Sequence, residues 1–430
     1  MRLYKMELYK ICSKKLFLFS VLASLSILLM YFWSYVSGAE STINGVKYTG
    51  YQAVKMDREI TEAFQGALTD EKVAQIAQEY GFPSGVAERV NTFLDKNYLN
   101  DFVMHGFSDG YFHNYENYHV GTCVYPIAET ELGKACAATG KTLLLEYSYG
   151  WKVFTEVLQV GCVMGLALIL LALASVFSEE SAVNTRQILF TTKEGMSGDI
   201  LAKIAAGMTV AVGVYVVIVL LDLVLSWGVF GLDGLDCLYS QVMEDSFIRD
   251  VNNYQNPSTA YMKEFLGFYV FFCFLGMAEM GAISLYFSAR CKTPFQSVAA
   301  SAMSILVPFL VFMLIRDGKG ALFVILSLLP LILPGIALAG FVPDFSNKGY
   351  SIITKLVCCV LPPTVMVGFL KRMFPFYITL PVWLIMQGIY WDITIWKMRY
   401  PWIQPAIFGF TVMATVVYIV CSWKGYKRIR

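Results

Sequence analysis

The sequence predicts an all-α polytopic membrane protein with about six transmembrane helices and a mostly helical extracytoplasmic domain inserted between the first two. Three observations lead to this fold class. Of the 430 residues, 57% are hydrophobic and only 15% are charged, which is unusual for a soluble globular domain. Several apolar stretches reach the ~20 residues that a helix needs to cross a bilayer. The more polar residues 38–150 separate the first two of these stretches.

The amino-terminal residues 1–15 are basic, and residues 16–36 follow as an apolar stretch of spanning length. A secretory signal peptide has the same order of charge and hydrophobicity, but its apolar region is shorter. The stretch also ends in Tyr31, Phe32, Trp33 and Tyr35, aromatic residues of the kind that anchor a helix at the membrane interface. We therefore expect a retained first transmembrane helix, with the amino terminus held in the cytosol by its Lys and Arg residues.

Residues 38–150 are expected to form the extracytoplasmic domain. Apolar periodicity predicts two amphipathic helices, Asp57–Leu68 and Thr69–Tyr80, with Thr69 as the N-cap of the second. Val86–Leu99 could form a third helix. The aromatic and amide side chains of residues 107–120 could bind a ligand, or they could pack locally within a loop-rich module.

The histidines and cysteines of this domain give no clear site. His105, His113 and His119 match no standard zinc spacing and have no cysteine pair beside them, so no metal site is predicted. Cys123 and Cys136 lie on the side of the membrane that can be oxidising. Their spacing leaves both a disulfide and two free thiols open, because it does not show whether the Cβ atoms meet.

Residues 135–142, ACAATGKT, superficially resemble a phosphate-binding P-loop. Ala135 stands where the first glycine belongs, and the preceding residues do not read as the strand that a P-loop follows. We therefore predict no nucleotide site, no catalytic residues and no cofactor in this chain. The net charge of +1 also gives no reason to expect a nucleic-acid partner.

The transmembrane domain is expected to occupy residues 151–430. Clear spans are predicted at Phe154–Phe177, Ile204–Trp227, Phe265–Ser288 and Ile403–Trp423. Prolines interrupt the apolar residues between 316 and 401, so we expect six spans, with eight as the alternative. The basic residues at 424–430 place the carboxyl terminus in the cytosol, which makes both termini cytosolic in a multi-pass plasma-membrane protein.

Two carboxylates fall inside predicted spans. Asp222 lies near the outer end of one span, and Glu279 lies within the next. A carboxylate at such a depth usually faces a cavity or another helix. A role in transport and a structural hydrogen bond between helices both remain open.

The segment of residues 178–203 is polar and lies between two long apolar stretches. It combines charged residues such as Glu179, Glu180 and Arg186 with the apolar Val183 and Ile188. Such a segment could form a helix on the membrane surface whose outer face meets a soluble partner, or it could be a solvated loop.

In several places the chain resembles the permease subunits of ABC exporters of the second type, especially bacterial ones for peptides or antibiotics. Tyr4–Ile11 resembles their cytosolic elbow helix, which residues 1–15 would form. The features of their cytosolic segment correspond to Glu179-Glu180, Asn184-Thr185, Ile188-Leu189, Lys193-Glu194-Gly195 and Lys203. Two residues depart from the pattern. Asn184 stands where glycine is common, and Met196 stands where a basic residue often follows the turn glycine.

This resemblance implies a coupling helix that contacts a separate ABC ATPase subunit. The implied contact residues are Glu179, Glu180, Thr185, Arg186, Lys193 and Gly195. ATP and Mg would be bound by that subunit, and a second permease copy or a paralogue would complete the transporter in the bacterial plasma membrane. The substrate would be a peptide, an antibiotic or another amphiphile. A non-transporting membrane sensor with a ligand-binding outer domain is the alternative.

Overall fold

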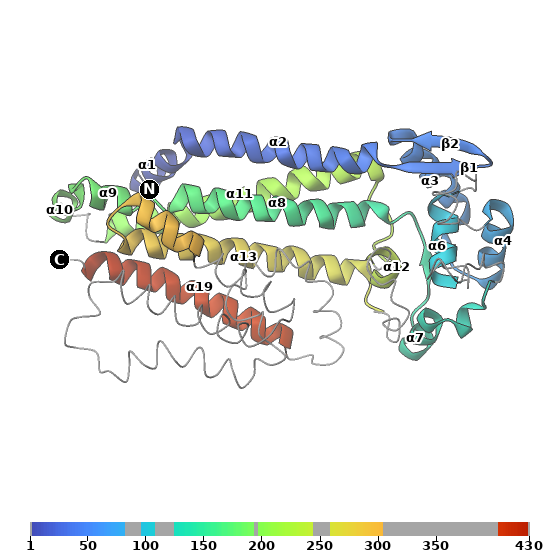
Figure 1. Ribbon diagram of the computed structural model, residues 1–430. Helices are drawn as coiled ribbons and strands as arrows, with labels where there is room; N and C mark the ends of the chain where they lie inside the picture. The colour runs from blue at the N-terminus through green and yellow to red at the C-terminus, as the bar shows by residue number, and fades with distance from the viewer. Residues whose placement is uncertain are drawn as a thin grey trace, which may run out of the picture.

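The computed structural model describes residues 2–81, 96–107, 124–192, 197–243, 259–303 and 403–428. This part of the chain is mostly helical, and it forms an elongated bundle of long helices with a small domain at one end (Figure 1). Both chain termini lie at the opposite end of the bundle. We call that end the terminal end and the other the domain end.

Four helices are long and apolar enough to cross a membrane. They are α2 (Lys15–Ser37), α8 (Tyr149–Leu173), α11 (Gly198–Phe230) and α13 (Met262–Arg290). At 1.5 Å per residue, even α2 is about 34 Å long, which exceeds the ~30 Å of bilayer hydrocarbon. The helix α19 (Ile403–Arg428) adds a shorter apolar segment, Val412–Tyr426. The membrane character predicted from the sequence is therefore supported, whereas the number of spans depends on residues outside the described ranges.

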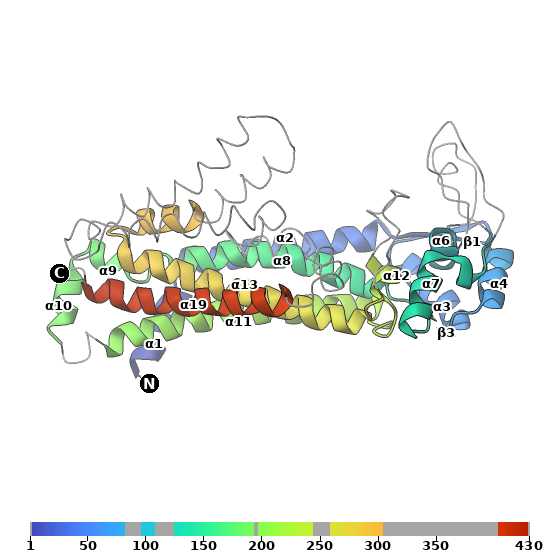
Figure 2. The same cartoon turned by 90° about the horizontal axis from the view of Figure 1, so that it is seen from below.

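The helix α8 lies at the centre of the bundle and packs against α2, α11 and α13 (Figure 2). The helix α13 also packs along α19, and the short α1 (Arg2–Cys12) lies on α11. Most residues in the apolar windows of α8 and α13 are buried, 61% and 72% respectively. For α2 and α11 the corresponding shares are only 17% and 28%. These two helices thus present large apolar faces to the surroundings of the bundle.

The close approach of α8 and α11 at the domain end depends on glycine. A Cβ atom on Gly150 would lie 1.9 Å from the carbonyl oxygen of Gly231. Gly231 itself has a φ of +75°, a conformation that other residues rarely adopt. The start of α8 therefore fits against the end of α11 only because position 150 carries no side chain.

The small domain contains more than the helices predicted for it. A hairpin joins β1 (Glu40–Ile43) to β2 (Val46–Thr49), and the short strands β3 (Gly66–Ala67) and β4 (Leu144–Leu145) also pair. Its helices in the described residues include α3 (Tyr51–Phe64), α4 (Asp70–Tyr80), α6 (Tyr98–Phe107) and α7 (Glu131–Thr139). The hairpin turns at Asn44 and Gly45, which both have positive φ angles. Asn-Gly is the strongest short-range sequence signal for such a turn, so the prediction of a mostly helical domain left out a readable hairpin.

The predicted helices of this domain are partly correct. Thr69 is confirmed as the N-cap of α4, since its Oγ1 accepts a hydrogen bond from the backbone N of Lys72 at 3.3 Å. The helix α3 begins and ends earlier than predicted, because the chain becomes strand β3 at Gly66. The helix predicted at Val86–Leu99 lies mostly outside the described residues, and α6 begins only at Tyr98.

Residues 135–142 occupy a position that a P-loop never has. The helix α7 ends at Thr139, and Gly140 caps it in the left-handed conformation with a φ of 67°. A P-loop opens a helix, whereas these residues close one. Residues 135–142 therefore do not have the geometry of a P-loop.

A tightly packed joint connects the small domain to the bundle. The Tyr98 hydroxyl of α6 lies 3.0 Å from Ser148 Oγ, just before α8. Arg58 of α3 lies 3.6 Å from Asp233, just after α11.

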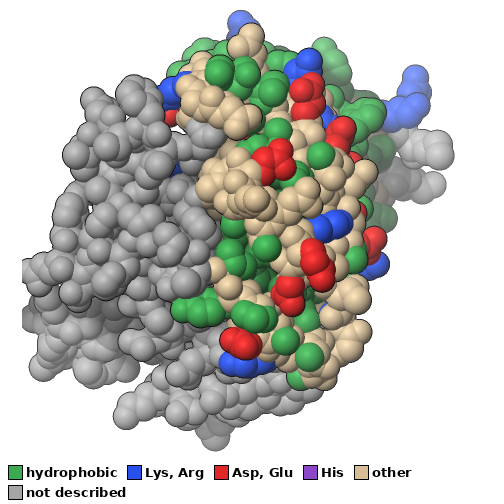
Figure 3. Space-filling model, turned by 90° about the vertical axis from the view of Figure 1, so that its right-hand side faces the viewer, with side chains coloured by type: hydrophobic (Ala, Val, Ile, Leu, Met, Phe, Trp, Pro, Cys, Tyr) green, Lys and Arg blue, Asp and Glu red, His purple; other side chains and the backbone are tan. Residues whose placement is uncertain are grey.

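Figure 3, which views the molecule from the domain end, shows Lys, Arg, Asp and Glu side chains interspersed with apolar ones on this part of the described surface.

Candidate functional site

The segment that sequence analysis singled out forms two short helices at the terminal end. They are α9 (Ser178–Ala182), which follows α8 after one turn, and α10 (Thr185–Phe190). Asn184 separates them with a φ of 58°. This left-handed conformation strongly favours glycine and is tolerated best by Asn and Asp among the other residues. The segment is therefore a bent pair of helices and not one continuous surface helix.

Glu180 of α9 points into the bundle. Its Oε1 lies 2.9 Å from Nζ of Lys203, whose side chain on α11 is fully buried. Lys203 also pairs with Asp199, one turn earlier on α11. Buried charges need such partners, because removing an ion from water costs several kcal/mol. The ion pair therefore fixes α9 to the start of α11.

The end of α19 is fastened to the same place. The Tyr426 hydroxyl donates a hydrogen bond to Glu180 Oε2 at 2.8 Å. Arg186 of α10 donates to the backbone carbonyl of Tyr426, and its guanidinium carbon lies 4.1 Å from the centre of the tyrosine ring. The rings of Phe177 and Phe190 pack against Tyr426 at centroid distances of 4.7 and 5.6 Å. One tyrosine thus joins α9, α10 and the carboxyl-terminal helix.

The amino-terminal helix also joins this group. Lys10 Nζ lies 3.2 Å from Glu180 Oε1, and Lys14 Nζ lies 2.7 Å from Glu179 Oε2. Burial raises the pKa of Glu7, although nearby lysines oppose the effect. Burial alone would lower the pKa of Lys10, but the carboxylates of Glu7 and Glu180 raise it overall. The pKa values of Glu7 and Lys10 therefore depend on the charged side chains around them.

We call this set the terminal polar cluster. Its members are Glu7, Lys10, Lys14, Glu179, Glu180, Arg186, Asp199, Lys203 and Tyr426. They come from α1, α9, α10, α11 and α19 and from Lys14 at the N-cap of α2, and α9 follows α8 after one turn. A displacement of α9 and α10 would therefore act on four long or terminal helices at once.

The outward side of α9 and α10 has a different chemistry. Val183 and Ile188 are 70% and 68% exposed, so this side of the segment presents two aliphatic side chains to its surroundings. Asn184 and Gln187 beside them are also exposed. The accessible surface of the segment is therefore apolar and amide in character.

The six residues implied as partner contacts thus fall into three groups. Glu180 and Arg186 are each only 8% exposed and make contacts within the chain. Glu179 has 43% of its side chain exposed, and Thr185 is half-buried with its Oγ1 3.4 Å from the carbonyl of Glu180. Lys193 and Gly195 lie outside the described residues.

Sequence reasoning did not assign Lys10, Lys14, Asp199 or Tyr426 to this site. The pair Asp199 and Lys203 has a readable signal, since residues four apart on a helix are neighbours. The contribution of Tyr426 has none, because 246 residues separate it from Glu180.

The two intramembrane acids are buried at different levels of the bundle. Asp222 is fully buried and accepts a hydrogen bond from Ser226 at 3.3 Å. Glu279 on α13 is 5% exposed. Tyr215 of α11 packs against Phe274 of α13, so these two residues lie at the same level of the bundle. Along the helix axes, Asp222 lies roughly 10 Å from this level toward the domain end, and Glu279 lies roughly 7 Å from it toward the terminal end. They are therefore two separate positions in the bundle.

The described residues do not test whether Cys123 and Cys136 form a disulfide. Cys136 is buried on α7, and Cys123 lies outside the described ranges. Of the aromatic-rich residues 107–120, only Phe107 is described, and it is fully buried in the core of the small domain.

Comparison of the chain with protein-family models, with curated proteins and with solved structures finds no match.

Proposed function

We propose that this chain is the transmembrane permease subunit of an ATP-driven ABC exporter, with α9 and α10 as the docking element for a separate ATPase subunit. The observation that carries the proposal is the two-sided construction of these helices. Their inner side is fastened by buried charges to α11 and α19, while their outer side exposes Val183 and Ile188. A docking element needs both a contact surface and a rigid attachment to the parts that it moves.

The conformation of Asn184 also supports the proposal. Its φ of 58° explains why glycine would be common at this position in the family that the chain resembles. Asparagine is the replacement that this conformation tolerates best, so the departure from the family pattern keeps the backbone geometry.

The proposed mechanism is mechanical coupling. Closure of two ATPase subunits on ATP and Mg would displace α9 and α10. The Lys203 ion pairs would carry that displacement to α11, and Tyr426 would carry it to α19. Rigid helices with packed interfaces transmit such a movement as a whole.

The remaining parts of the proposal follow from this arrangement. The terminal end would face the cytosol of a bacterium and the small domain its exterior, with six transmembrane helices per subunit. Two such subunits, identical or related, would form the pathway for a peptide, an antibiotic or another amphiphilic substrate moving outward. The small domain would meet the substrate at the exit.

Co-purification in mild detergent tests the proposal. The wild-type chain should retain an ABC ATPase, and Val183→Asp or Ile188→Asp should reduce the retained amount by about tenfold, since a desolvated charge opposes docking. Val46→Asp is the matched control, because Val46 is 52% exposed on the small domain. If the stably extracted wild type retains no ATPase, the exporter proposal fails and a membrane sensor becomes the better interpretation.

A further inference from the structure

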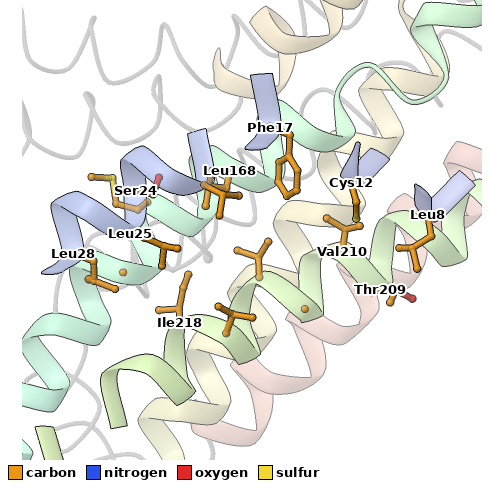
Figure 4. A pocket seen from close by; sticks show the side chains of 16 residues that line it. Leu8, Cys12, Phe17, Ser24, Leu25, Leu28, Leu168, Thr209, Val210 and Ile218 are labelled. Carbon is orange, nitrogen blue, oxygen red and sulfur yellow. The ribbon is translucent and has the colours of Figure 1, made fainter. Parts of the chain in front are cut away.

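An apolar groove runs along the bundle between α2 and α11, with α8 as its floor (Figure 4). Its volume is about 330 Å³, and side chains from α1 bound it at the terminal end. Among the residues that line it are Leu25 and Leu28 of α2, Leu168 of α8 and Val217 of α11. Hydrocarbon side chains dominate this lining, so an occupant would be held by burial of apolar surface.

Glycine residues shape the groove. Gly161 on the floor allows α8 to approach closely, since a Cβ atom there would lie 2.6 Å from Ile218. Gly213 on the wall is exposed, and a Cβ atom there would meet nothing within 4 Å. The hollow beside Gly213 is therefore open space and does not result from tight helix packing.

The groove is accessible from the side of the bundle. Val217 on its wall is 55% exposed, and the helices α2 and α11 that flank it are the least buried of the four apolar helices. In a membrane-spanning bundle such a side opening faces lipid. The continuous hydrocarbon environment makes an acyl chain the natural occupant.

Charge at the terminal end of the groove identifies the kind of lipid. Lys5 precedes the groove residue Leu8 by three positions, which places both on one face of α1. Lys5 is exposed. The neighbouring acid Glu179 is paired with Lys14. Lys5 therefore places a positive charge at this end of the groove, which suits a phosphate group.

We propose that the groove binds one acyl chain of an anionic phospholipid, whose headgroup phosphate is held by Lys5. Bound lipid would fill the space between α1, α2 and α11 and stabilise the contact of the amino-terminal helix with the bundle. This inference depends on the membrane location of the helices and not on transport.

Native mass spectrometry of the delipidated full chain, titrated with phosphatidylglycerol or phosphatidylcholine, tests the inference. The wild type should bind one phosphatidylglycerol molecule more tightly than further ones. Gly213→Leu should weaken this first binding event by about tenfold or more, because its side chain fills the groove. Gly228→Leu on the same helix is the matched control, since a Cβ atom there also meets nothing within 4 Å.

Two further variants make the test decisive. Leu25→Trp fills the groove from the α2 side and should reproduce the loss if Gly213→Leu alters the fold. Lys5→Glu should still bind phosphatidylcholine but lose the preference for phosphatidylglycerol. Equal lipid binding by the wild type and both filling variants would overturn the inference. The inference would also be overturned if a second copy of the chain covered the groove. In that case the filling variants would lose a dimer in the mass spectra and would keep their bound lipid.

Discussion

Nζ of Lys203 lies 2.9 Å from Oε1 of Glu180, and no part of the lysine side chain is exposed. This contact joins the start of α11 to α9, and Asp199 completes the neutralisation of the lysine. An ion pair in such a position does little for stability compared with well-packed apolar groups, but its disruption is costly. The Lys203–Glu180 ion pair therefore serves mainly to fix the position of α9 relative to α11.

Removal of the buried lysine should destabilise the protein strongly. Lys203→Met leaves Glu180 and Asp199 without their shared partner, and we expect a loss of about 3–5 kcal/mol in the free energy of unfolding. Thermal unfolding in detergent would measure it. Lys263→Met is the control, because Lys263 pairs with Asp236 on the surface and the loss of an exposed pair should change the melting temperature little.

The same lysine offers a second comparison. Adding Glu180→Gln and Asp199→Asn to Lys203→Met should restore part of the stability, because no uncompensated charge then stays buried. Equal melting temperatures for Lys203→Met and Lys263→Met would show that the buried ion pairs do not hold the helices together.

Asn184 should tolerate glycine but not a β-branched residue. Its φ of 58° is open to glycine, so Asn184→Gly should change stability by less than about 0.5 kcal/mol. Asn184→Val should cost about 1–3 kcal/mol, since valine is strained in this conformation. Melting temperatures would compare them with Gln187→Val, an exposed control within α10. A harmless Asn184→Val would mean that the bend between α9 and α10 does not need a left-handed residue.

The sequence predicts the long helices well because their signal is local. Apolar stretches of spanning length place α2, α8, α11 and α13 within a few residues of their observed bounds. The terminal polar cluster could be predicted only in part. Its charges are visible in the sequence, but the direction in which Glu180 and Arg186 point depends on Tyr426, a contact across more than half of the chain. Helical periodicity carries no information about such distant partners.

Asp57 should make the stability of the small domain depend on pH. Burial raises the pKa of this carboxyl to about 6 from its usual 3.8, against the effect of hydrogen bonds from Ser41 and from the backbone of Tyr98. The folded state then holds the proton more tightly than the unfolded state. The contribution of Asp57 to stability is therefore fully present below about pH 4 and is lost as the pH rises through 6.

Thermal unfolding of the full chain between pH 5 and pH 7 would measure this effect. The wild type should lose about 1–1.5 kcal/mol of stability over this pH range, since one pKa unit corresponds to about 1.4 kcal/mol and the rest of the effect falls below pH 5. In Asp57→Asn this part of the pH dependence should disappear, because the amide oxygen still accepts both hydrogen bonds without a charge. Glu59→Gln, at an exposed position of α3, should keep the wild-type slope. An unchanged slope in Asp57→Asn would show that the carboxyl titrates normally.

Gly150 should be the least replaceable glycine at the joint between the bundle and the small domain. A Cβ atom there would lie 1.9 Å from the carbonyl oxygen of Gly231, so Gly150→Ala must push α8 away from α11. Since the atom in the way belongs to the backbone, we expect a loss of about 1–3 kcal/mol, as for other overpacked sites. Gly228→Ala on α11 meets nothing within 4 Å and should instead gain up to about 1 kcal/mol from its better helix propensity. Opposite shifts in melting temperature would support this arrangement of the joint. Equal shifts would mean that the two helices do not meet at Gly150 as closely as described.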